Sequence, residues 1–533
     1  MSQPLAYESA TGARRRVTVH SILFAGDGLP GEIEQAREPA HFADLNLDQV
    51  VASVTADRAE YALTPFFHWP LSEPEAVSYR QEVFQDLEQR DVHELVAAFA
   101  QRTLVAKFGY VTREMERDTP DFGHYHRARA FLNAADGYCA AVSALAAGLA
   151  EVTVHSRGLL GLRGYLERHV GSPAFSELQA ETRRLEDALR AVSYCILVKG
   201  SRVTVGRHSD QLDYSEQVTR TFARFAQGAA TDYRDVRPGW KEEEFAAIGV
   251  LHLVSKLYPD LFAALDSFCA QHAGYLDPTV ALADREFQFY LSYLDHIRPL
   301  RQAGLSFSYP RMSVDSKDEQ ALDTFDLALA TKLVKQADQV VCNDISLTGP
   351  ERILVISGPN NGGKTTLART VGQLHYLARL GCPVPGRDLR LFLCDQIFTH
   401  FEKEEDITTL AGKLQDELNR LRADLDRATP ASVVILNEVF SSTTAQDAQF
   451  LSRKILKRLF ELDALGVCVT FLEDLSTLSE KTVSMVSQVV ADDPATRTHK
   501  VIRVAADGRA YARALAQKYG LTYEQITVGR ATP

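Results

Sequence analysis

The sequence lacks the features that mark several common classes of protein. Its seven cysteines lie far apart and form no CxxC pair, so they predict neither a disulfide framework nor a zinc site, and they suit a reducing compartment. No apolar run approaches the roughly 20 residues that are needed to cross a bilayer. The apolar stretch that follows Arg14, Arg15 and Arg16 is too short and too polar for a signal sequence. We therefore expect a cytoplasmic protein without a membrane partner.

Other absences narrow the choice further. The formal net charge of -12 excludes a surface that is basic all over, so any contact with nucleic acid must be a local basic patch. The sequence has no internal repeat and no low-complexity segment, and its apolar heptads do not continue long enough for a long coiled coil. A chain of 533 residues exceeds what one hydrophobic core usually serves, which predicts two or three domains.

Helical periodicity dominates from about residue 41 to 300. One apolar set falls on a single helix face, which indicates packing in a core, and we expect that helix to end at Pro299. The set is Phe287, Tyr290, Leu291, Leu294 and Ile297.

The helical region is interrupted near 194–207, where two short apolar runs flank the sequence KGSR (199–202). This pattern predicts a β-hairpin inserted among helices. Lys199 and Arg202 would lie at its tip, with Arg207 just beyond. These three side chains could contact nucleic-acid phosphates, or they could simply belong to a solvated hairpin end.

The pattern changes after Gly304. Leu305, Phe307 and Tyr309 alternate with serines, as in a strand that stops at Pro310, and a polar linker is expected over 313–320. From about residue 330, short apolar strands alternate with helices. This alternation is typical of an α/β domain with a largely parallel sheet.

The most specific pattern in the sequence lies in the α/β part. An apolar strand (352–356) leads through Ser357 into GPNNGGKT (358–365), which matches GxxxxGK[ST], and a helix is expected to begin at Thr366. Glycines let successive backbone N–H groups turn toward phosphates at a helix N-terminus. We expect Lys364 to reach the β and γ phosphates of ATP and the Thr365 hydroxyl to bind Mg²⁺. The expected nucleotide-binding residues of this segment are Gly358, Pro359, Asn360, Asn361, Gly362, Gly363, Lys364, Thr365 and Thr366.

A second apolar strand (432–436) ends in Asn437 and Glu438. In phosphate-loop ATPases the first of these positions carries an acid that holds Mg²⁺, and the second can polarise the attacking water. Asn437 brings no charge, so we expect weaker Mg²⁺ binding or slower turnover unless Asp395 or Asp447 lies near enough to compensate. Glu438 keeps the position of a general base. The alternative is that both residues have only a structural role.

Together these residues resemble the MutS family of DNA repair ATPases. The motifs that carry the resemblance are NDI (343–345), GPNNGGKT (358–365), GCPVP (381–385), IFT (397–399), the strand and turn at 432–443, GRAYARALAQKYG (508–520) and, more weakly, Pro70, Leu71, Tyr79, Arg80 and Gln81.

The resemblance implies a multidomain fold: a helical core and lever region with a small β insertion, followed by an α/β P-loop ATPase domain of the ABC type. The implied division is an N-terminal extension (1–40), the helical domain (41–325) with the clamp-like hairpin, and the ATPase domain (326–533). It also implies that two ATPase domains pair head to tail. Each would supply a signature helix, here with Gly412, Lys413 and Glu417, to the nucleotide of the other. Val340 would cover adenine, and Asn343 would belong to the nucleotide site.

Several positions depart from the family pattern. Gly412 stands where the family has serine, Val340 where it has an aromatic residue, and Thr470-Phe471 where it has threonine-histidine, so the expected γ-phosphate sensor is missing. Only some forty residues precede the core-like region, so a mismatch-reading domain is not expected, and neither is a nuclease module.

We therefore expect a magnesium-dependent ATPase that works as a homodimer and clamps duplex or branched DNA without reading mismatches. Two alternatives stay open. One is a protein-interaction switch that does not act on DNA, and the other is a weakly hydrolysing ATP-binding scaffold.

Overall fold

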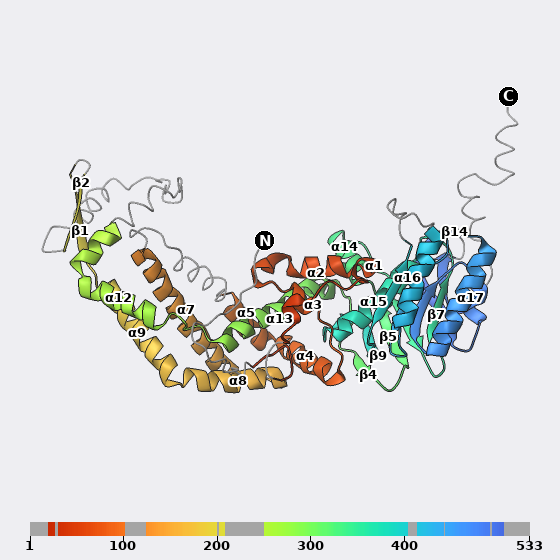
Figure 1. Ribbon diagram of the computed structural model, residues 1–533, viewed down its shortest axis with the longest axis horizontal. Helices are drawn as coiled ribbons and strands as arrows, with labels where there is room; N and C mark the ends of the chain where they lie inside the picture. The colour runs from red at the N-terminus through yellow and green to blue at the C-terminus, as the bar shows by residue number, and fades with distance from the viewer. Residues whose placement is uncertain are drawn as a thin grey trace, which may run out of the picture. The chain divides into compact units, whose positions relative to one another are not determined.

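The computed structural model describes residues 20–26, 30–101, 124–199, 202–207, 250–402, 413–441, 443–490 and 493–505. The chain divides into two compact units. Unit 1 comprises Met1–Arg90, Val154–Gly161 and Glu286–Pro533, and unit 2 comprises Asp91–Thr153 and Leu162–Arg285. Both helices and sheets contribute to this multidomain structure (Figure 1). Unit 1 thus contains both ends of the helical region together with the C-terminal sheet. This differs from a chain with a single boundary near residue 326. The expected domain boundaries stay a prediction.

The helices of the described residues are α1 (Phe42–Leu45), α2 (Leu47–Thr55), α3 (Thr64–Phe67), α4 (Pro74–Leu87), α5 (Arg90–Ala100), α7 (His124–Glu151), α8 (Arg157–Val170), α9 (Pro173–Arg190), α12 (Pro259–Gln271), α13 (Pro278–Gln302), α14 (Leu327–Lys335), α15 (Lys364–Arg379), α16 (Lys413–Arg427) and α17 (Ala445–Leu462). Short 3₁₀ helices include η2 (Ala56–Tyr61) and η5 (Glu473–Thr477). Several helices begin at side-chain caps that the sequence supplies. Ser172, for example, accepts a hydrogen bond from the N–H of Phe175 at the start of α9.

Unit 2 is built around α7, which packs against α9 and α12. By length and composition alone, α7 would also pass as a membrane-crossing helix, although half of its most apolar window is buried inside the protein. Its apolar side chains, among them Phe131 and Leu145, are buried in this helical core. The apolar character of α7 is therefore explained by packing within unit 2.

A hairpin forms in unit 2 where one was expected. Strands β1 (Tyr194–Lys199) and β2 (Arg202–Arg207) pair in antiparallel register, with Lys199 opposite Arg202. Arg207 lies at the other end of the hairpin, opposite Tyr194. Its guanidinium donates to the Leu257 carbonyl (2.7 Å) and lies over the Tyr258 ring. Arg207 therefore fastens the base of the hairpin, whereas Lys199 and Arg202 are exposed at its tip.

Helix α13 confirms the expected apolar face but not the expected end. Phe287, Tyr290 and Ile297 are fully buried. The expectation that the helix ends at Pro299 is wrong, because α13 continues to Gln302. Proline removes only its own N–H from the helix, and its carbonyl still accepts a hydrogen bond from Ala303 (3.0 Å).

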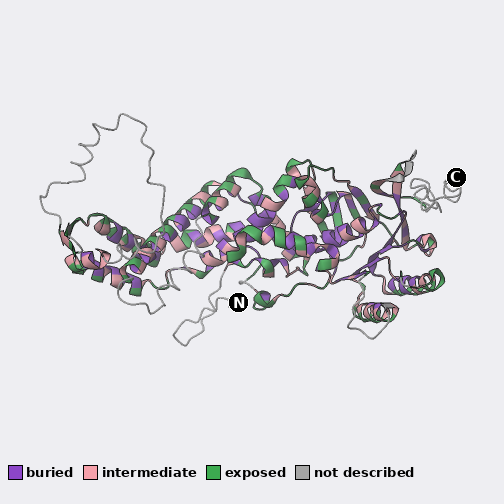
Figure 2. Ribbon diagram, turned by 90° about the horizontal axis from the view of Figure 1, so that it is seen from above, coloured by how far each residue is buried: buried purple, intermediate pink, exposed green. Residues whose placement is uncertain are grey.

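The large sheet of unit 1 has the strand order β10-β11-β12-β7-β13-β14. Its strands are β7 (Ile353–Ser357), β10 (Ile397–Phe401), β11 (Val433–Asn437), β12 (Leu465–Val469), β13 (Thr482–Val490) and β14 (Asp493–Arg503). All neighbours are parallel except β13 and β14. The three central strands β7, β11 and β12 are buried along their whole length (Figure 2), which explains their nearly continuous apolar sequences.

Smaller sheets flank the large one. Strands β4 (Arg311–Ser313), β9 (Arg387–Phe392), β5 (Glu319–Thr324) and β6 (Asn343–Leu347) form a four-stranded sheet in that order, and β3 (Phe307–Ser308) pairs with β8 (Val384–Pro385). The expected linker over 313–320 is therefore shorter, because Ser313, Glu319 and Gln320 belong to strands. The strand expected over 305–309 is reduced to β3.

Helix α15, which follows the glycine-rich loop (358–365), is held along its length by the N-terminal helical segment. Its side chains donate to backbone carbonyls of that segment in four successive contacts, all within unit 1. These are Arg369 to Asp44 (2.9 Å), Gln373 to Leu45 (2.8 Å), Tyr376 to Phe67 (2.8 Å) and Arg379 to Leu71 (3.2 Å). Beyond the helix, buried Arg80 donates to the Leu380 carbonyl (3.1 Å). Residues 42–80 therefore form part of the support of the loop.

Candidate nucleotide site

The expected site residues meet at one edge of the large sheet. Strand β7 leads into the glycine-rich loop, and β11 ends in Asn437, with the end of β12 between them. Because these strands are parallel, their carboxyl ends share one edge, where ligands of α/β sheets usually bind. In the sheet, β12 lies between β7 and β11, although it follows both in the sequence. This strand order brings residues that are far apart in the sequence to the same edge.

The loop has the backbone that an anion cradle requires. Gly358 and Gly363 have φ angles of 119° and 90°, which other residues rarely adopt. A Cβ atom on Gly363 would also lie 3.0 Å from the His499 carbonyl oxygen. Helix α15 begins directly after Gly363, so its N-terminal N–H groups and positive dipole end face the loop.

Lys364 is almost completely buried within this loop. Its ammonium group donates to the carbonyls of Gly358 and Pro359 (both 3.1 Å) and to Oδ1 of Asn360 (3.3 Å). It lies 3.5 Å from a carboxylate oxygen of Glu438. Burial lowers the pKa of Lys364, while the charge of Glu438 raises it. The loop therefore holds a buried cation at its centre, next to the expected general base.

Thr365 and Asn437 join the start of α15 directly to the end of β11. The Thr365 hydroxyl donates to Oδ1 of Asn437 at 2.9 Å. Hydroxyl and amide oxygens are hard donors of the kind that Mg²⁺ accepts. With the glycine cradle and Lys364 beside them, the residues present fit a magnesium–nucleoside triphosphate, although this pair carries no negative charge.

Glu438 has an unusual backbone for its type. Its φ angle is 53°, and that of Phe440 is 64°, so two non-glycine residues of one turn are left-handed. The N–H of Glu438 donates to the Val469 carbonyl (3.0 Å), which fixes the turn to the end of β12. Backbone strain of this kind concentrates at functional sites, and here it places the Glu438 carboxylate beside Lys364.

Comparison with known proteins agrees with this geometry. Residues 354–527 match the family model of MutS domain V. Over this part, the chain is similar to proteins of the MutS family. It is 34% identical over 192 residues to "Endonuclease MutS2" of Thermomicrobium roseum, 31% over 194 residues to "DNA mismatch repair protein MutS" of Shouchella clausii, and 26% over 293 residues to the protein of that name from Halalkalibacterium halodurans.

The matches cover 35%, 36% and 54% of this chain, and 24%, 22% and 33% of those MutS relatives. The chain thus spans at most about a third of the length of these curated relatives. The similarity includes the glycine-rich loop from Gly358 onward and the end of β11. The closing motif at 508–520 also falls within the matched range but lies outside the described residues.

The helix that the resemblance to MutS predicts as the signature helix is α16. Gly412 lies outside the described residues, and α16 begins at Lys413. Glu417 is buried, and its carboxylate accepts a hydrogen bond from the N–H of Phe440 (3.0 Å). In this chain Glu417 therefore supports the turn that carries Glu438. Its role toward a second copy stays a prediction.

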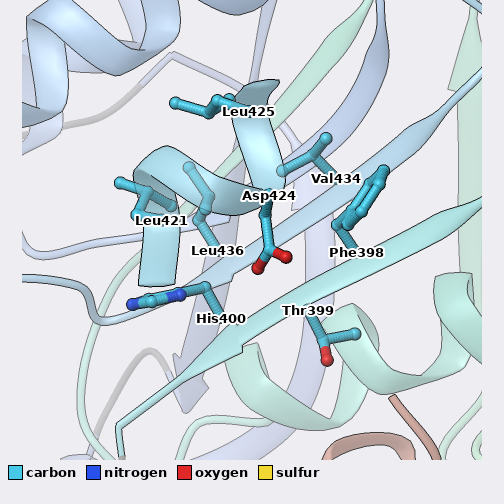
Figure 3. A pocket seen from close by; sticks show the side chains of 8 residues that line it. All are labelled: Phe398, Thr399, His400, Leu421, Asp424, Leu425, Val434 and Leu436. Atoms are coloured by element: carbon cyan, nitrogen blue, oxygen red, sulfur yellow. The ribbon is translucent and has the colours of Figure 1, made fainter. Parts of the chain in front are cut away.

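Helix α16 packs closely on the edge of the large sheet. The side chains that line the small cavity between them are those of Leu421, Asp424 and Leu425 on the helix and Phe398, Thr399, His400, Val434 and Leu436 on the strands (Figure 3). The cavity measures about 10 Å³. That volume is no more than one water molecule needs, so it is not a ligand site.

Asp395 cannot supply the charge that Asn437 lacks. Its carboxylate accepts hydrogen bonds from the hydroxyls of Thr429 (2.5 Å) and Ser432 (2.8 Å), just before β11 begins, whereas Asn437 is the last residue of that strand. The suggestion that Asp395 compensates is therefore wrong, because the whole strand separates the two side chains. Asp447 accepts from the Thr444 hydroxyl (2.8 Å) at the start of α17, and its compensating role stays a prediction.

The other two expected nucleotide-binding residues, Val340 and Asn343, lie on or just before β6. Val340 is half-buried just before β6. Asn343 is buried on β6, where its Oδ1 accepts from the N–H of Val501 (2.7 Å) and its side-chain nitrogen donates to the His499 carbonyl (3.4 Å). Asn343 therefore holds β14 in place. Phe471, at the expected sensor position, is exposed, and the centroid of its ring lies 4.4 Å from the Lys364 nitrogen.

Sequence reasoning missed the pair β13–β14 as part of the site. The Ser487 hydroxyl on β13 donates to the Gly362 carbonyl (2.6 Å), and Arg497 on β14 donates through Nε to the Asn360 carbonyl (3.1 Å). No motif marks these two residues. They reach the loop only because β13 lies beside β7 in the sheet.

Proposed function

We propose that the chain is an ATPase of the MutS type that binds ATP and Mg²⁺ at the glycine-rich loop and uses nucleotide state as a conformational switch. One observation carries the proposal. Lys364 and Thr365 at the start of α15 meet Asn437 and Glu438 at the end of β11, through contacts of 2.9 and 3.5 Å. A purely structural role for Asn437 and Glu438 would not require this arrangement around a buried lysine.

Each residue has a definable task in this proposal. The loop amides and Lys364 would bind the phosphates, and Glu438 would orient and polarise the attacking water. The Thr365 hydroxyl and the Asn437 amide oxygen would hold Mg²⁺, which neutralises phosphate charge when bound. A neutral amide attracts the ion less than a carboxylate, and Phe471 offers no hydrogen bond to a phosphate. A slowly hydrolysing switch is therefore the form of the activity that these residues favour.

The wider proposal concerns partners. We propose that two copies pair across their nucleotide sites, with α16 of each copy facing the nucleotide of the other, as in an ABC-type dimer. In the cytoplasm, the pair would clamp duplex or branched DNA, with Lys199 and Arg202 of the hairpin on the phosphates. The names of the MutS relatives and the exposed cations of the hairpin tip support DNA as the partner. The alternative, supported by the net charge of -12, is a protein partner.

Equilibrium binding of labelled ATP with Mg²⁺, together with phosphate release, tests the central claim. We expect Lys364→Ala to lose ATP binding by about a hundredfold, because each charge-assisted hydrogen bond to phosphate contributes about 1.5–3 kcal/mol. Glu438→Ala should retain ATP and release phosphate at least about a hundredfold more slowly. Equal phosphate release by wild type and Glu438→Ala would contradict catalysis. Equal ATP retention by wild type and Lys364→Ala would contradict the site itself.

A further inference from the structure

The strand pair β13–β14 contacts the glycine-rich loop at two of its carbonyl groups. Ser487 holds the carbonyl of Gly362, and Arg497 holds that of Asn360. The backbone of β14 also lies directly against the loop at Gly363, next to the His499 carbonyl. The segment that contacts these carbonyls therefore lies far from the loop in the sequence. Asn360 and Arg497, for example, are 137 residues apart.

The position of β14 is itself fixed by several bonds. Asn343 binds the backbone of both Val501 and His499, and Lys500 donates to the Cys342 carbonyl (2.6 Å). Arg497 is thus carried by a strand that pairs with β13 and is bonded to Cys342 and Asn343, which gives its guanidinium a defined position next to the loop.

Arg497 and Lys364 bind the same residue from two directions. Arg497 donates to the main-chain carbonyl of Asn360, and Lys364 donates to its side-chain oxygen (3.3 Å). Two cations therefore lie against the same loop residue. Two cations beside one neutral residue repel each other, and a polyanion in the loop would remove this repulsion.

We propose that Arg497 is a second phosphate-contacting cation of the nucleotide site, selective for a nucleoside triphosphate over a diphosphate. This inference rests on the proposed ATP binding. A guanidinium carries five N–H donors in a planar fork, so it can hold the Asn360 carbonyl and a phosphate oxygen at the same time. It supplies the charge and the hydrogen bonds that the Phe471 ring, at the expected sensor position, does not have.

The test compares Arg497→Ala and Arg497→Lys with Arg503→Ala, in the full-length protein. Arg503→Ala is the matched control, since it removes an arginine from the same strand but from an ion pair with Glu351.

Affinities for fluorescent ATP and ADP with Mg²⁺ are measured by titration, and thermal unfolding is followed in parallel. We expect Arg497→Ala to weaken ATP binding by about tenfold or more and ADP binding by at most about threefold, in line with the loss of a charge-assisted hydrogen bond. Arg497→Lys should recover part of the loss, because it keeps the charge.

Each outcome is decisive. If Arg497→Ala binds both nucleotides as well as Arg503→Ala does, Arg497 does not contact phosphate. If it loses ATP and ADP equally and unfolds at a lower temperature, Arg497 merely holds the loop, and the inference is wrong. If the wild type binds neither nucleotide, the proposed function fails first, and the inference fails with it.

Discussion

At the scale of single residues, the affinity of the nucleotide site for its ligands depends on how charge is distributed around the loop. Lys364 lies beside the carboxylate of Glu438, whereas the position that would hold Mg²⁺ pairs the neutral groups of Thr365 and Asn437. A neutral oxygen attracts a divalent cation less than a carboxylate oxygen does. The affinity for the metal should therefore respond to a change of charge at this position.

Replacement of Asn437 by aspartate tests this directly. The side chain keeps its size and its hydrogen bond from Thr365 but gains a negative charge beside the metal position. We expect the Mg²⁺ concentration for half-maximal phosphate release to fall about tenfold, which corresponds to about 1.4 kcal/mol. A magnesium titration measures it, with Asn437→Ala as the control that loses both oxygen and charge. An aspartate variant with the same magnesium dependence as wild type would show that Asn437 does not contact the ion.

Helix α15 is the element on which the position of the loop depends. Its N-terminus carries Lys364, and the helix is held along its length by side chains that bind the segment from Asp44 to Leu71. Gly372 permits this packing, because a Cβ atom there would lie 2.6 Å from Leu45 and 2.8 Å from Ile435. The helix is thus held between the N-terminal segment and β11.

Gln373 is the centre of this contact. It is fully buried, donates to the Leu45 carbonyl (2.8 Å) and to Asp326 (2.9 Å), and accepts from the N–H of Leu327 (2.8 Å). Gln373→Leu would leave several buried polar groups without partners, so we expect it to lower the free energy of unfolding by about 2–4 kcal/mol. Tyr376→Phe removes one hydrogen bond and should cost only about 1 kcal/mol. Urea unfolding measures both; equal effects would show that the Gln373 contacts are not decisive.

At the scale of the whole molecule, the proposed ATP binding and the proposed DNA binding belong to different units. The nucleotide site belongs to unit 1, and the hairpin with Lys199 and Arg202 belongs to unit 2. A switch requires nucleotide to bind one conformation better than another, so DNA affinity should depend on the nucleotide present. The hairpin and the site can therefore be tested by substitutions that leave each other's unit intact.

The combined substitution of Lys199 and Arg202 by alanine tests the DNA proposal. Each phosphate contact contributes a slope of about 0.9 to the dependence of log affinity on log salt. Loss of two contacts in each copy of the pair should lower that slope by about 3.6 and weaken DNA binding at low salt. Electrophoretic or fluorescence titrations over a range of salt measure this, with Lys454→Ala and Arg458→Ala on α17 as a control of equal charge. An unchanged slope would exclude the hairpin tip and favour a protein partner.

The sequence by itself determined the local features: the strand, loop and helix around Lys364, the buried strand that ends at Asn437, and the hairpin at 194–207. Each depends on neighbouring residues, whose periodicity and glycine content are visible in order along the chain. The tertiary structure decided which distant groups complete the site. The pairing of β13 with β7 brings Ser487 and Arg497 to the loop, the course of β11 removes Asp395 from it, and the packing of α15 joins it to residues 42–80. Such contacts follow from the order of strands in the sheet and from helix packing, and no local pattern of residues encodes them.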